Sequence, residues 1–288
     1  MRIGYDDDLP GPPAGISLLM VLGLYLVDGP PNYKPSGGVW QETLVLSLER
    51  LGYTNHAARQ AVARATRRGI LAAQRRGRRA CMSLTDVGQD LLRDGGRRLL
   101  AFGEPWKWDG CWLLVNLRVP ESRRDARQRL RNRLSWAGFG SLGNGLWLSP
   151  HVDREAELAS VLSAEPAAQA WTFRAHNGEL GDINQLVRQA WDIDAMIADY
   201  DLFIAEFGRA HPRTPEECFI SYNSLWSRWR DFPFIDPDLP AELFPKGWLR
   251  ERAYAVFQER CNRWVDPARC FVASLEPGET AGTGLDLP

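Results

Sequence analysis

One short segment of this chain carries many positive charges and no negative charge. Between residues 50 and 79 there are nine arginines and no aspartate or glutamate, whereas the whole chain of 288 residues has 35 basic and 36 acidic residues. These arginines are Arg50, Arg59, Arg64, Arg67, Arg68, Arg75, Arg76, Arg78 and Arg79. An ordinary protein surface mixes both signs of charge. The fold must therefore display this segment as a one-sided basic surface.

The basic segment predicts a helix followed by a two-stranded ribbon. Thr54 is a suitable N-terminal cap for the helix, and Gly69 is a suitable stop. The apolar positions of the helix form a thin stripe of small residues at Ala58, Ala61, Val62 and Ala65. Apolar residues then recur across 70–84 on both sides of Gly77. This pattern predicts a β-ribbon that turns at the glycine.

A basic helix followed by a basic ribbon is typical of a winged helix that binds DNA. Arg59 and Gln60 lie in the first turns, where a recognition helix meets base edges, and both side chains can form paired hydrogen bonds with bases. We expect the ribbon tip to hold phosphates or to enter the minor groove. A solvated helix face is the alternative, and His56 also fits a structural role beside the cap. The predicted DNA-binding residues are Asn55, His56, Arg59, Gln60, Arg64, Arg67, Arg75, Arg76, Arg78 and Arg79.

The chain is long for one domain, and its patterns predict three domains of the α+β class. The first is an N-terminal winged helix-turn-helix, the second a central ferredoxin-like βαββαβ domain for dimerisation or coupling, and the third a helical C-terminal domain. The predicted ranges are a disordered lead-in at 1–15, then domains at 16–102, 103–181 and 182–275, and a flexible tail at 276–288.

Periodicity and turn residues predict the elements of each domain. In the first domain the further predicted helices are 16–27, 41–51 and 86–92. In the second domain the predicted strands and helices are 112–119, 121–138, a hairpin over 139–149, 152–164 and 171–175. In the third domain the predicted helices are 183–207, 216–229 and 248–264. The prolines of 229–245 predict a rigid extended connection between the last two helices.

The C-terminal domain contains a cluster of aromatic and basic residues. One interpretation is a pocket for a flat acyl group, with arginines near phosphates. The other is a set of buried rings that grip the proline-rich connection. A buried ion pair with Asp236 is a separate alternative for Arg230. The candidate ligand-binding residues are Trp226, Arg228, Trp229 and Arg230.

Several classes of protein are disfavoured by composition. The net charge of −1 excludes a general nucleic-acid coat. The five cysteines form no Cys-x-x-Cys pattern and the four histidines are scattered, so we expect reduced thiols in a cytoplasm and no metal site. The apolar run 16–27 is too short to span a bilayer. No catalytic arrangement or cofactor motif is visible, so we expect a protein that is not an enzyme.

Four stretches of this sequence resemble the PaaX family of bacterial transcriptional repressors. They are Gly38-Val-Trp-Gln41, residues 56–88, residues 108–150 with Gly145-Leu-Trp-Leu-Ser-Pro150, and residues 229–248 with Asp236-Pro-Asp-Leu-Pro240. The resemblance covers nearly the whole chain. It implies a homodimer that binds double-stranded DNA at a palindromic, inverted-repeat operator. It also implies release by an acyl-CoA thioester, such as phenylacetyl-CoA or a related aryl-CoA.

Two alternatives stay open. One is a DNA-binding regulator or activator that needs no effector. The other is a metal-dependent nuclease, because the central domain also resembles a small nuclease of CRISPR adaptation. That family carries a metal-binding carboxylate near the end of its first strand, where this chain has Arg118. An arginine cannot ligate Mg²⁺, which binds oxygen, so the nuclease is disfavoured. The arginine-rich helix 121–138 is expected to be a solvated face, with a secondary contact to DNA or CoA phosphates as the alternative.

Overall fold

The computed structural model describes residues 14–24, 38–104, 106–163 and 168–277. Helices and two antiparallel sheets make up these residues, which confirms the predicted α+β class. The described chain forms two compact units. We call the first the N-terminal unit; it contains the described residues up to Gly95 together with His211–Ser224 and residues 261–277. The second, the central unit, contains Gly96–Ala210 and Leu225–Arg260. Most of the predicted lead-in and tail lies outside the described residues.

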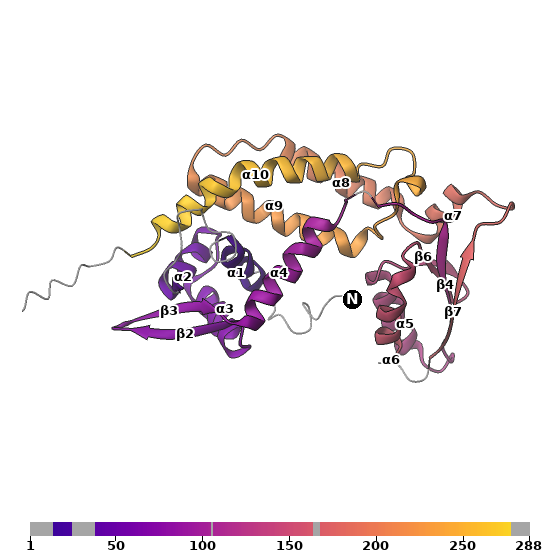
Figure 1. Cartoon of the computed structure of the whole chain (residues 1–288), viewed down its shortest axis with the longest axis horizontal. Helices are drawn as coiled ribbons and strands as arrows, with labels where there is room; N and C mark the ends of the chain where they lie inside the picture. The colour runs from indigo at the N-terminus through magenta and orange to yellow at the C-terminus, as the bar shows by residue number, and fades with distance from the viewer. Residues whose placement is uncertain (1–13, 25–37, 105, 164–167, 278–288) are drawn as a thin grey trace, which may run out of the picture. The chain divides into compact units, whose positions relative to one another are not determined.

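The N-terminal unit contains a small three-stranded sheet and the basic helix. Up to Gly95 its elements are α1 (Ala14–Leu22), β1 (Val39–Trp40), α2 (Gln41–Arg50), α3 (Asn55–Arg67), β2 (Leu71–Arg76), β3 (Arg79–Leu84) and the start of α4 (Asp86–Ala101). Figure 1 labels all of these except β1. The strand order is β1-β3-β2, with Val39 paired to Met82. Two residues carry no detectable alternation, so the sequence pattern does not reveal β1. The first helix begins two residues earlier than predicted.

Helix α4 is longer than the prediction of 86–92, since it runs to Ala101. Its start is fixed as predicted by Thr85, whose hydroxyl accepts a hydrogen bond from the Gly88 amide at 3.1 Å. The same hydroxyl donates to the Gly69 carbonyl. Thr85 thus ties the beginning of α4 to the residue that ends α3. The predicted helix stopped early because Gly95 and Gly96 weaken a helical pattern.

Replacing Gly88 with alanine should lower the free energy of unfolding by about 1–3 kcal/mol, the usual cost of overpacking. A Cβ at this buried glycine would lie 2.2 Å from the Ile70 carbonyl oxygen, so either α4 or the start of β2 has to move. Gly96→Ala, in the same helix with nothing within 4 Å of its Cβ, should instead be neutral or stabilising by up to about 1 kcal/mol. Urea unfolding curves of both variants make the test. Equal effects would contradict the close approach at Gly88.

The central unit contains a four-stranded antiparallel sheet. Between residues 111 and 176 the elements in chain order are β4 (Cys111–Arg118), α5 (Arg124–Trp136), β5 (Gly140–Gly143), β6 (Leu146–Ser149), the 3-10 turn η2 (Val152–Arg154), α6 (Glu155–Ser163) and β7 (Gln169–His176). The strand order is β5-β6-β4-β7. Helices α5 and α6 cover one face, where Leu113 and Val115 pack with Leu130, Leu134 and Leu158. The other face packs through Trp112 and Leu148 against Trp191 and Leu239.

The predicted helix 183–207 is wrong as a single element. It is divided into α7 (Ile183–Ala190) and α8 (Ile193–Gly208). Trp191 adopts an extended backbone, and the Asp192 side chain accepts a hydrogen bond from the Ala195 amide, which caps α8. The Trp191 ring lies against Gly140 and stacks near Trp112 at 6.4 Å. Packing of this ring on the sheet therefore sets the break.

The predicted extended connection from residue 229 is wrong in its first part. Helix α9 (Pro215–Ile235) continues through Pro233, and α10 (Arg250–Ser274) continues through Pro267. Only a short 3-10 turn, η3 (Ala241–Leu243), lies in the connection that remains. A proline inside a helix removes one hydrogen bond, and aromatic packing offsets this loss at Phe232, which is buried beside Pro233. The division between the two units falls inside α4, α9 and α10.

Candidate nucleic-acid interface

Helix α3 presents one buried face and one basic face. Thr54 caps the helix as predicted, and its hydroxyl accepts a hydrogen bond from the Ala57 amide at 3.2 Å. The predicted alanine and valine stripe is buried. The small side chains permit close packing of α3 on the rest of the unit. On the remaining surface the residues predicted to bind DNA are Asn55, His56, Arg59, Gln60 and Arg67, all exposed, and Arg64, which is half-buried.

The first turns of α3 form an ordered set of hydrogen bonds. Arg59 Nε donates to Asn55 Oδ1 at 2.8 Å, and Asn55 Nδ2 donates to Glu49 Oε1 at 3.0 Å. Gln60 Nε2 and His56 Nε2 lie 2.8 Å apart. A guanidinium has five N–H donors, so Arg59 keeps further donors for an external acceptor. The bond to Asn55 limits the directions in which the exposed Arg59 side chain can project.

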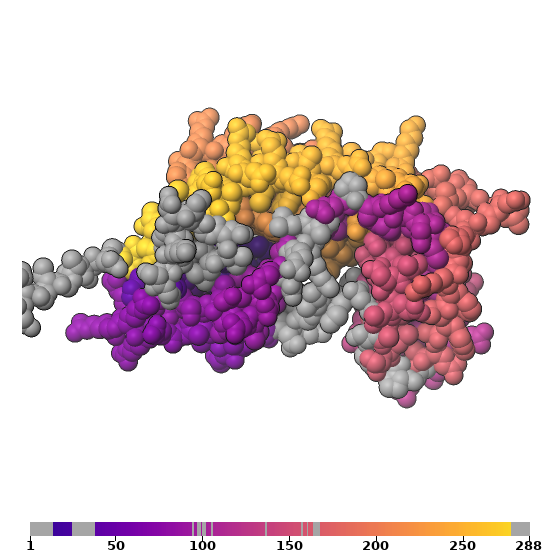
Figure 2. All heavy atoms as spheres, in the orientation of Figure 1, coloured from indigo at the N-terminus to yellow at the C-terminus, as the bar shows by residue number. Residues whose placement is uncertain are grey.

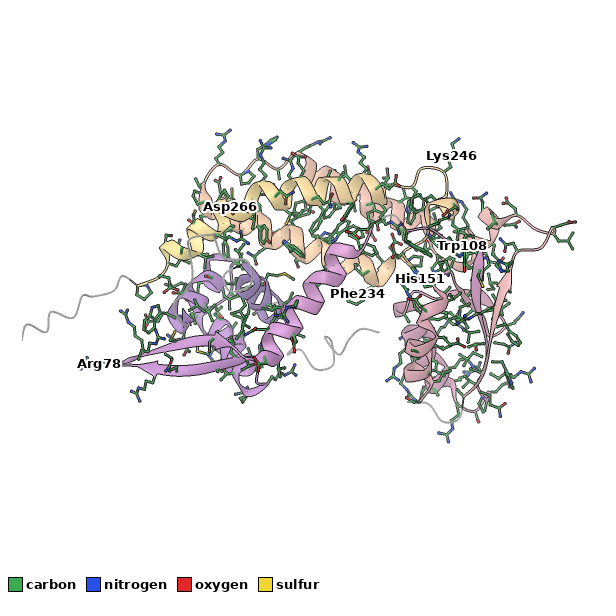
Figure 3. The ribbon with its side chains drawn as sticks, viewed as in Figure 1. Arg78, Trp108, His151, Phe234, Lys246 and Asp266 are labelled. Atoms are coloured by element: carbon green, nitrogen blue, oxygen red, sulfur yellow. The ribbon has the colours of Figure 1, made fainter. Side chains whose placement is uncertain are left out.

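The ribbon of β2 and β3 carries the second half of the basic surface. Gly77 turns the ribbon at φ +63°, as predicted. Arg76 lies directly opposite Arg79 across the strands, and Arg75 lies opposite Ala80. Arg75, Arg76, Arg78 and Arg79 are all exposed. Figure 3 labels Arg78 at the outer end of the ribbon, and Figure 2 shows this end projecting from its surroundings.

Like charges directly opposite each other destabilise a pair of strands. An anion bound at the tip would relieve this repulsion between Arg76 and Arg79. Part of the charge of Arg79 is already balanced, because its Nε lies 3.6 Å from Glu42 Oε2. The exposed ribbon tip is therefore suited to hold a phosphate.

Sequence reasoning missed the acids that border this surface. Glu49 contacts Asn55, Glu42 contacts Arg79, and Glu216 lies 3.1 Å from Arg50. Two of these acids come just before the basic segment and the third comes from α9, so inspection of residues 50–79 alone could not find them. The arginine surface is rimmed by carboxylates, which limits the area open to a polyanion.

The predicted ligand-binding tryptophans lie in an aromatic cluster of the central unit. Trp229 is fully buried, stacks on Phe257 at 4.6 Å, and donates from Nε1 to the Leu99 carbonyl at 3.0 Å. Trp226 meets the same phenylalanine edge-on at 5.1 Å. Around the Trp229 ring lie the aromatic rings of Phe102, Phe203, Phe232, Tyr254 and Phe257.

The two predicted arginines of this region lie apart from the buried tryptophan. Arg228 Nε is 3.9 Å from Glu206 Oε2, and Arg230 donates to Asp231 at 2.9 Å. The predicted ion pair of Arg230 with Asp236 is wrong, because Asp236 binds a different arginine. The charge pattern along α9 cannot identify the arginine that pairs with Asp236, because that arginine lies on α10.

That partner is Arg250, which is 1% exposed and joins three groups of the loop before η3. It lies 3.4 Å from Asp236 Oδ1 and 2.9 Å from Asp238 Oδ1, and it donates to the Leu239 carbonyl at 2.6 Å. Tyr200 of α8 donates to Asp236 at 2.5 Å. Burial raises the pKa of Asp236, and burial also raises the pKa of Asp238 to about 6. We call Tyr200, Asp236, Asp238 and Arg250 the buried charge cluster.

A surface depression of about 480 Å³ lies beside this cluster. It is lined by Glu104, Trp106, Lys107, Asp109, Pro150, His151, Val152, Asp153 and Asp238. His151 Nε2 lies 3.0 Å from the Asp238 carbonyl, and burial lowers the pKa of His151 to about 4 (Figure 3). Asp238 is paired with Arg250, and the three other carboxylates against one lysine give this depression the wrong charge for the phosphates of CoA.

Arg118 lies near the end of the first central strand, at the position where a nuclease would need a metal-binding carboxylate. Arg118 ends β4, and its guanidinium lies over the Trp171 ring at 5.5 Å from the ring centroid. Across the described ranges, we find no group of three or more His, Cys, Asp or Glu side chains that could hold a metal ion. No helix in the described part of the chain is long and apolar enough to cross a bilayer.

Comparisons with known proteins cover nearly the whole chain. Residues 21–88 match the family described as PaaX-like protein, residues 105–187 the PaaX protein central Cas2-like domain, and residues 191–274 the PaaX-like protein C-terminal domain. The Transcriptional repressor PaaX of Escherichia coli (strain K12) is 30% identical over 264 residues, which is 88% of this chain and 82% of that protein.

A solved structure shares the fold. The uncharacterized protein Rv0674 from Mycobacterium tuberculosis superposes with a TM-score of 0.60 at 18% identity, covering 88% of this chain and 97% of the other. At that identity the likeness concerns the fold alone. The sequence relationship is stronger, since it includes three consecutive matched regions and a relative aligned over 264 residues. This chain therefore belongs to the PaaX family.

Proposed function

We propose that this protein is a cytoplasmic transcriptional repressor that binds double-stranded DNA in a sequence-specific manner. The observation that carries the proposal is that two neighbouring basic parts of the chain are both exposed. They are the basic face of α3 and the arginine-rich tip of the ribbon that follows α3. Membership of the PaaX family supports it, as does a relative named as a transcriptional repressor. No catalytic residue and no cofactor form part of the proposal.

We assign the reader to a winged helix-turn-helix domain at 16–102, the central ferredoxin-like domain to 103–181 and the helical domain to 182–275. In this assignment α3 enters the major groove and residues 75–79 of the ribbon lie on the phosphate backbone or in the minor groove. Support comes from the order α2, α3, β2, β3 and from the strand order of the central sheet.

A homodimer with two-fold symmetry would place two readers on one operator. Two-fold symmetry in the protein requires an inverted repeat in the DNA, with half-sites separated by whole turns of about 10 base pairs. The effector would favour a protomer arrangement with the wrong half-site spacing. To release the operator strongly, it must prefer that state by roughly 3–5 kcal/mol.

The proposed effector is an acyl-CoA thioester, phenylacetyl-CoA or a related aryl-CoA, and it rests on family membership. Trp226, Arg228, Trp229 and Arg230 remain the proposed contacts. Because Trp229 is enclosed by side chains, binding of a flat acyl group there has to open the aromatic cluster. The acidic depression beside His151 is the less suitable place for a phosphate-bearing ligand.

The direct test is fluorescence anisotropy of the purified protein on the DNA upstream of its own gene. Titrations at fixed salt are made with and without phenylacetyl-CoA, and free CoA serves as the control. Tight binding that the thioester abolishes supports a ligand-released repressor. Tight binding that no thioester changes keeps the DNA reader and favours an effector-independent regulator. Absence of preference for the upstream DNA over random DNA would refute sequence-specific repression.

Replacing Arg59 with alanine should weaken binding to the specific site by about 1–3 kcal/mol, the worth of a good paired contact with a base. Binding to random DNA should change little if Arg59, which donates to Asn55 at 2.8 Å, contacts a base edge rather than a phosphate. Arg252→Ala, which removes an exposed arginine of α10, is the matched control for loss of one charge. Equal weakening on specific and random DNA would remove Arg59 from the base-reading residues.

A further inference from the structure

Strand β7 leaves one of its edges unpaired. All eight of its residues pair with β4 in an unbroken register, from Cys111 with His176 to Arg118 with Gln169. It is the last strand of the sheet order, and no other strand among the described residues pairs with its outer edge (Figure 1). Natural proteins protect such edges with prolines, bulges or covering elements. The eight residues of β7 contain no proline and no bulge.

The same strand holds two aromatic side chains out in solvent. Trp171 lies opposite Asn116 and Phe173 lies opposite Leu114, so both point to the sheet face that carries Trp112. The helical cover on that face reaches Trp112 but stops short of the edge. Trp171 is 46% exposed and Phe173 is 56% exposed. Arg118 lies over the Trp171 ring and adds a positive charge to this aromatic patch.

The opposite face of β7 carries paired charges. Thr172 donates to Glu155 Oε1 at 2.6 Å, and Arg174 lies 3.5 Å from Glu155 Oε2. The hydrogen bond from Thr172 lowers the pKa of Glu155, which keeps this carboxylate ionised. The edge therefore presents aromatic rings on one face and both signs of charge on the other.

These features are self-complementary. Two copies of one strand can pair antiparallel about a two-fold axis perpendicular to the sheet. Residues that lie opposite each other then share a sheet face, and side chains alternate faces along the strand. The axis must therefore pass beside a residue rather than between two residues. An axis at Thr172 places Trp171 opposite the partner's Phe173, and this contact occurs twice. On the other face it brings the partner's Arg174 diagonal to Thr172, within reach of Glu155. Aromatic pairs and opposite charges are the cross-strand contacts that stabilise sheets.

We propose that β7 is the dimer interface, and that two copies of this chain join their edges antiparallel around Thr172 to form one continuous eight-stranded sheet. The inference rests on the proposed function only in that an inverted-repeat operator requires a two-fold dimer. The occupant is a second copy because the aromatic and charged contacts of the edge complement each other.

The test compares two substitutions of one residue by analytical ultracentrifugation of the full chain. Phe173→Lys and Phe173→Glu remove the same ring, but in the proposed register residue 173 faces the partner's Trp171 and the partner's Arg118 above it. Lysine meets that arginine with a like charge, and glutamate meets it with an opposite one. Each substitution occurs twice in a two-fold interface. Phe173→Lys should therefore raise the dimer dissociation constant about 100-fold or more, and the increase caused by Phe173→Glu should be about tenfold smaller than that caused by Phe173→Lys.

Leu202→Lys is the control, since Leu202 is an exposed apolar residue of α8, and it should leave the dimer unchanged. Circular dichroism and thermal melting establish that each variant is folded. Equal weakening by lysine and glutamate would overturn the register at Thr172. A wild-type chain that stays monomeric, or a Phe173→Lys variant that stays fully dimeric, would overturn the interface itself.

Anisotropy on the upstream DNA separates this inference from the proposed function. If the wild type is a dimer that Phe173→Lys dissociates but neither protein prefers the upstream DNA, the interface stands and the repressor function fails. If the wild type binds this DNA and Phe173→Lys remains dimeric, the function stands and the interface fails.

Discussion

Replacing Arg250 with methionine should lower the free energy of unfolding by about 3–5 kcal/mol, the usual cost of removing one partner from a buried ion pair. Arg250 is 1% exposed and Asp236 is completely buried. Methionine fills a similar length of space but leaves both Asp236 and Asp238 without their cation. It also removes the donor to the Leu239 carbonyl, which lies in the core of the sheet face.

The loss should depend on pH in a defined direction. Without Arg250, burial raises the folded-state pKa of Asp236 further above the ordinary value of 3.8. Between these two pKa values the folded state binds more protons than the unfolded state, so stability falls as pH rises. The deficit of the variant should therefore be larger at pH 8 than at pH 5. Urea unfolding followed by tryptophan fluorescence at both values measures it.

Arg252→Met provides the matched control, because Arg252 is exposed two residues further along α10. An exposed arginine contributes roughly 0–1 kcal/mol, so this variant should unfold close to the wild type at either pH. If Arg250→Met behaved like the control, the arginine would not hold the loop before η3. The link from α8 and α10 to that loop would then depend on aromatic packing alone.

The parts of the fold that sequence reasoning predicted well are those fixed by neighbouring residues. Thr54 and Thr85 cap helices within three residues of themselves. Gly77 turns a ribbon whose strands pair from one side of it to the other. The alanine stripe of α3 needs only helical spacing to be recognised. The elements that carry the basic surface can therefore be predicted without any tertiary contact.

The parts that sequence reasoning missed depend on residues far apart in the chain. Trp191 interrupts a helical pattern because its ring packs on strand residues about 50–80 positions earlier. The prolines of 229–245 predict an extended connection after a helix at 216–229, yet the aromatic cluster around Phe232 supports the helix through Pro233. Local propensity is a weak guide where tertiary packing opposes it. The same holds for Arg250, whose partners no charge pattern along one helix could identify.

The candidate site shows the same division. Its arginines could be predicted from the sequence, because nine of them occur without an acid between residues 50 and 79. Its carboxylate rim could not, because Glu216 reaches Arg50 from another part of the chain. The DNA-binding role of each residue stays a prediction. Arg59 is held by a hydrogen bond to Asn55, while Arg79 shares its charge with Glu42.

Replacing the four ribbon-tip arginines with alanine should weaken DNA binding on every sequence and change its salt dependence. The residues are Arg75, Arg76, Arg78 and Arg79. Each lost phosphate contact flattens the slope of log K against log salt by about 0.9, so up to four contacts predict a slope flatter by roughly 3–4. Because Arg79 is partly neutralised by Glu42, the lower end of this range is expected. The variant should fold normally, since all four side chains are exposed and two of them repel each other.

A second fourfold variant separates local contact from net charge. Arg123, Arg124, Arg127 and Arg131 are exposed on and before α5, and replacing them with alanine removes the same total charge from the central unit. Anisotropy titrations between 50 and 200 mM salt should give this variant a slope close to that of the wild type. Equal flattening by the two sets would mean that α5 also lies on the phosphate backbone. A flat slope for the α5 variant with an unchanged slope for the ribbon variant would move the polyanion contact away from the ribbon, and the winged-helix assignment would lose its main electrostatic support.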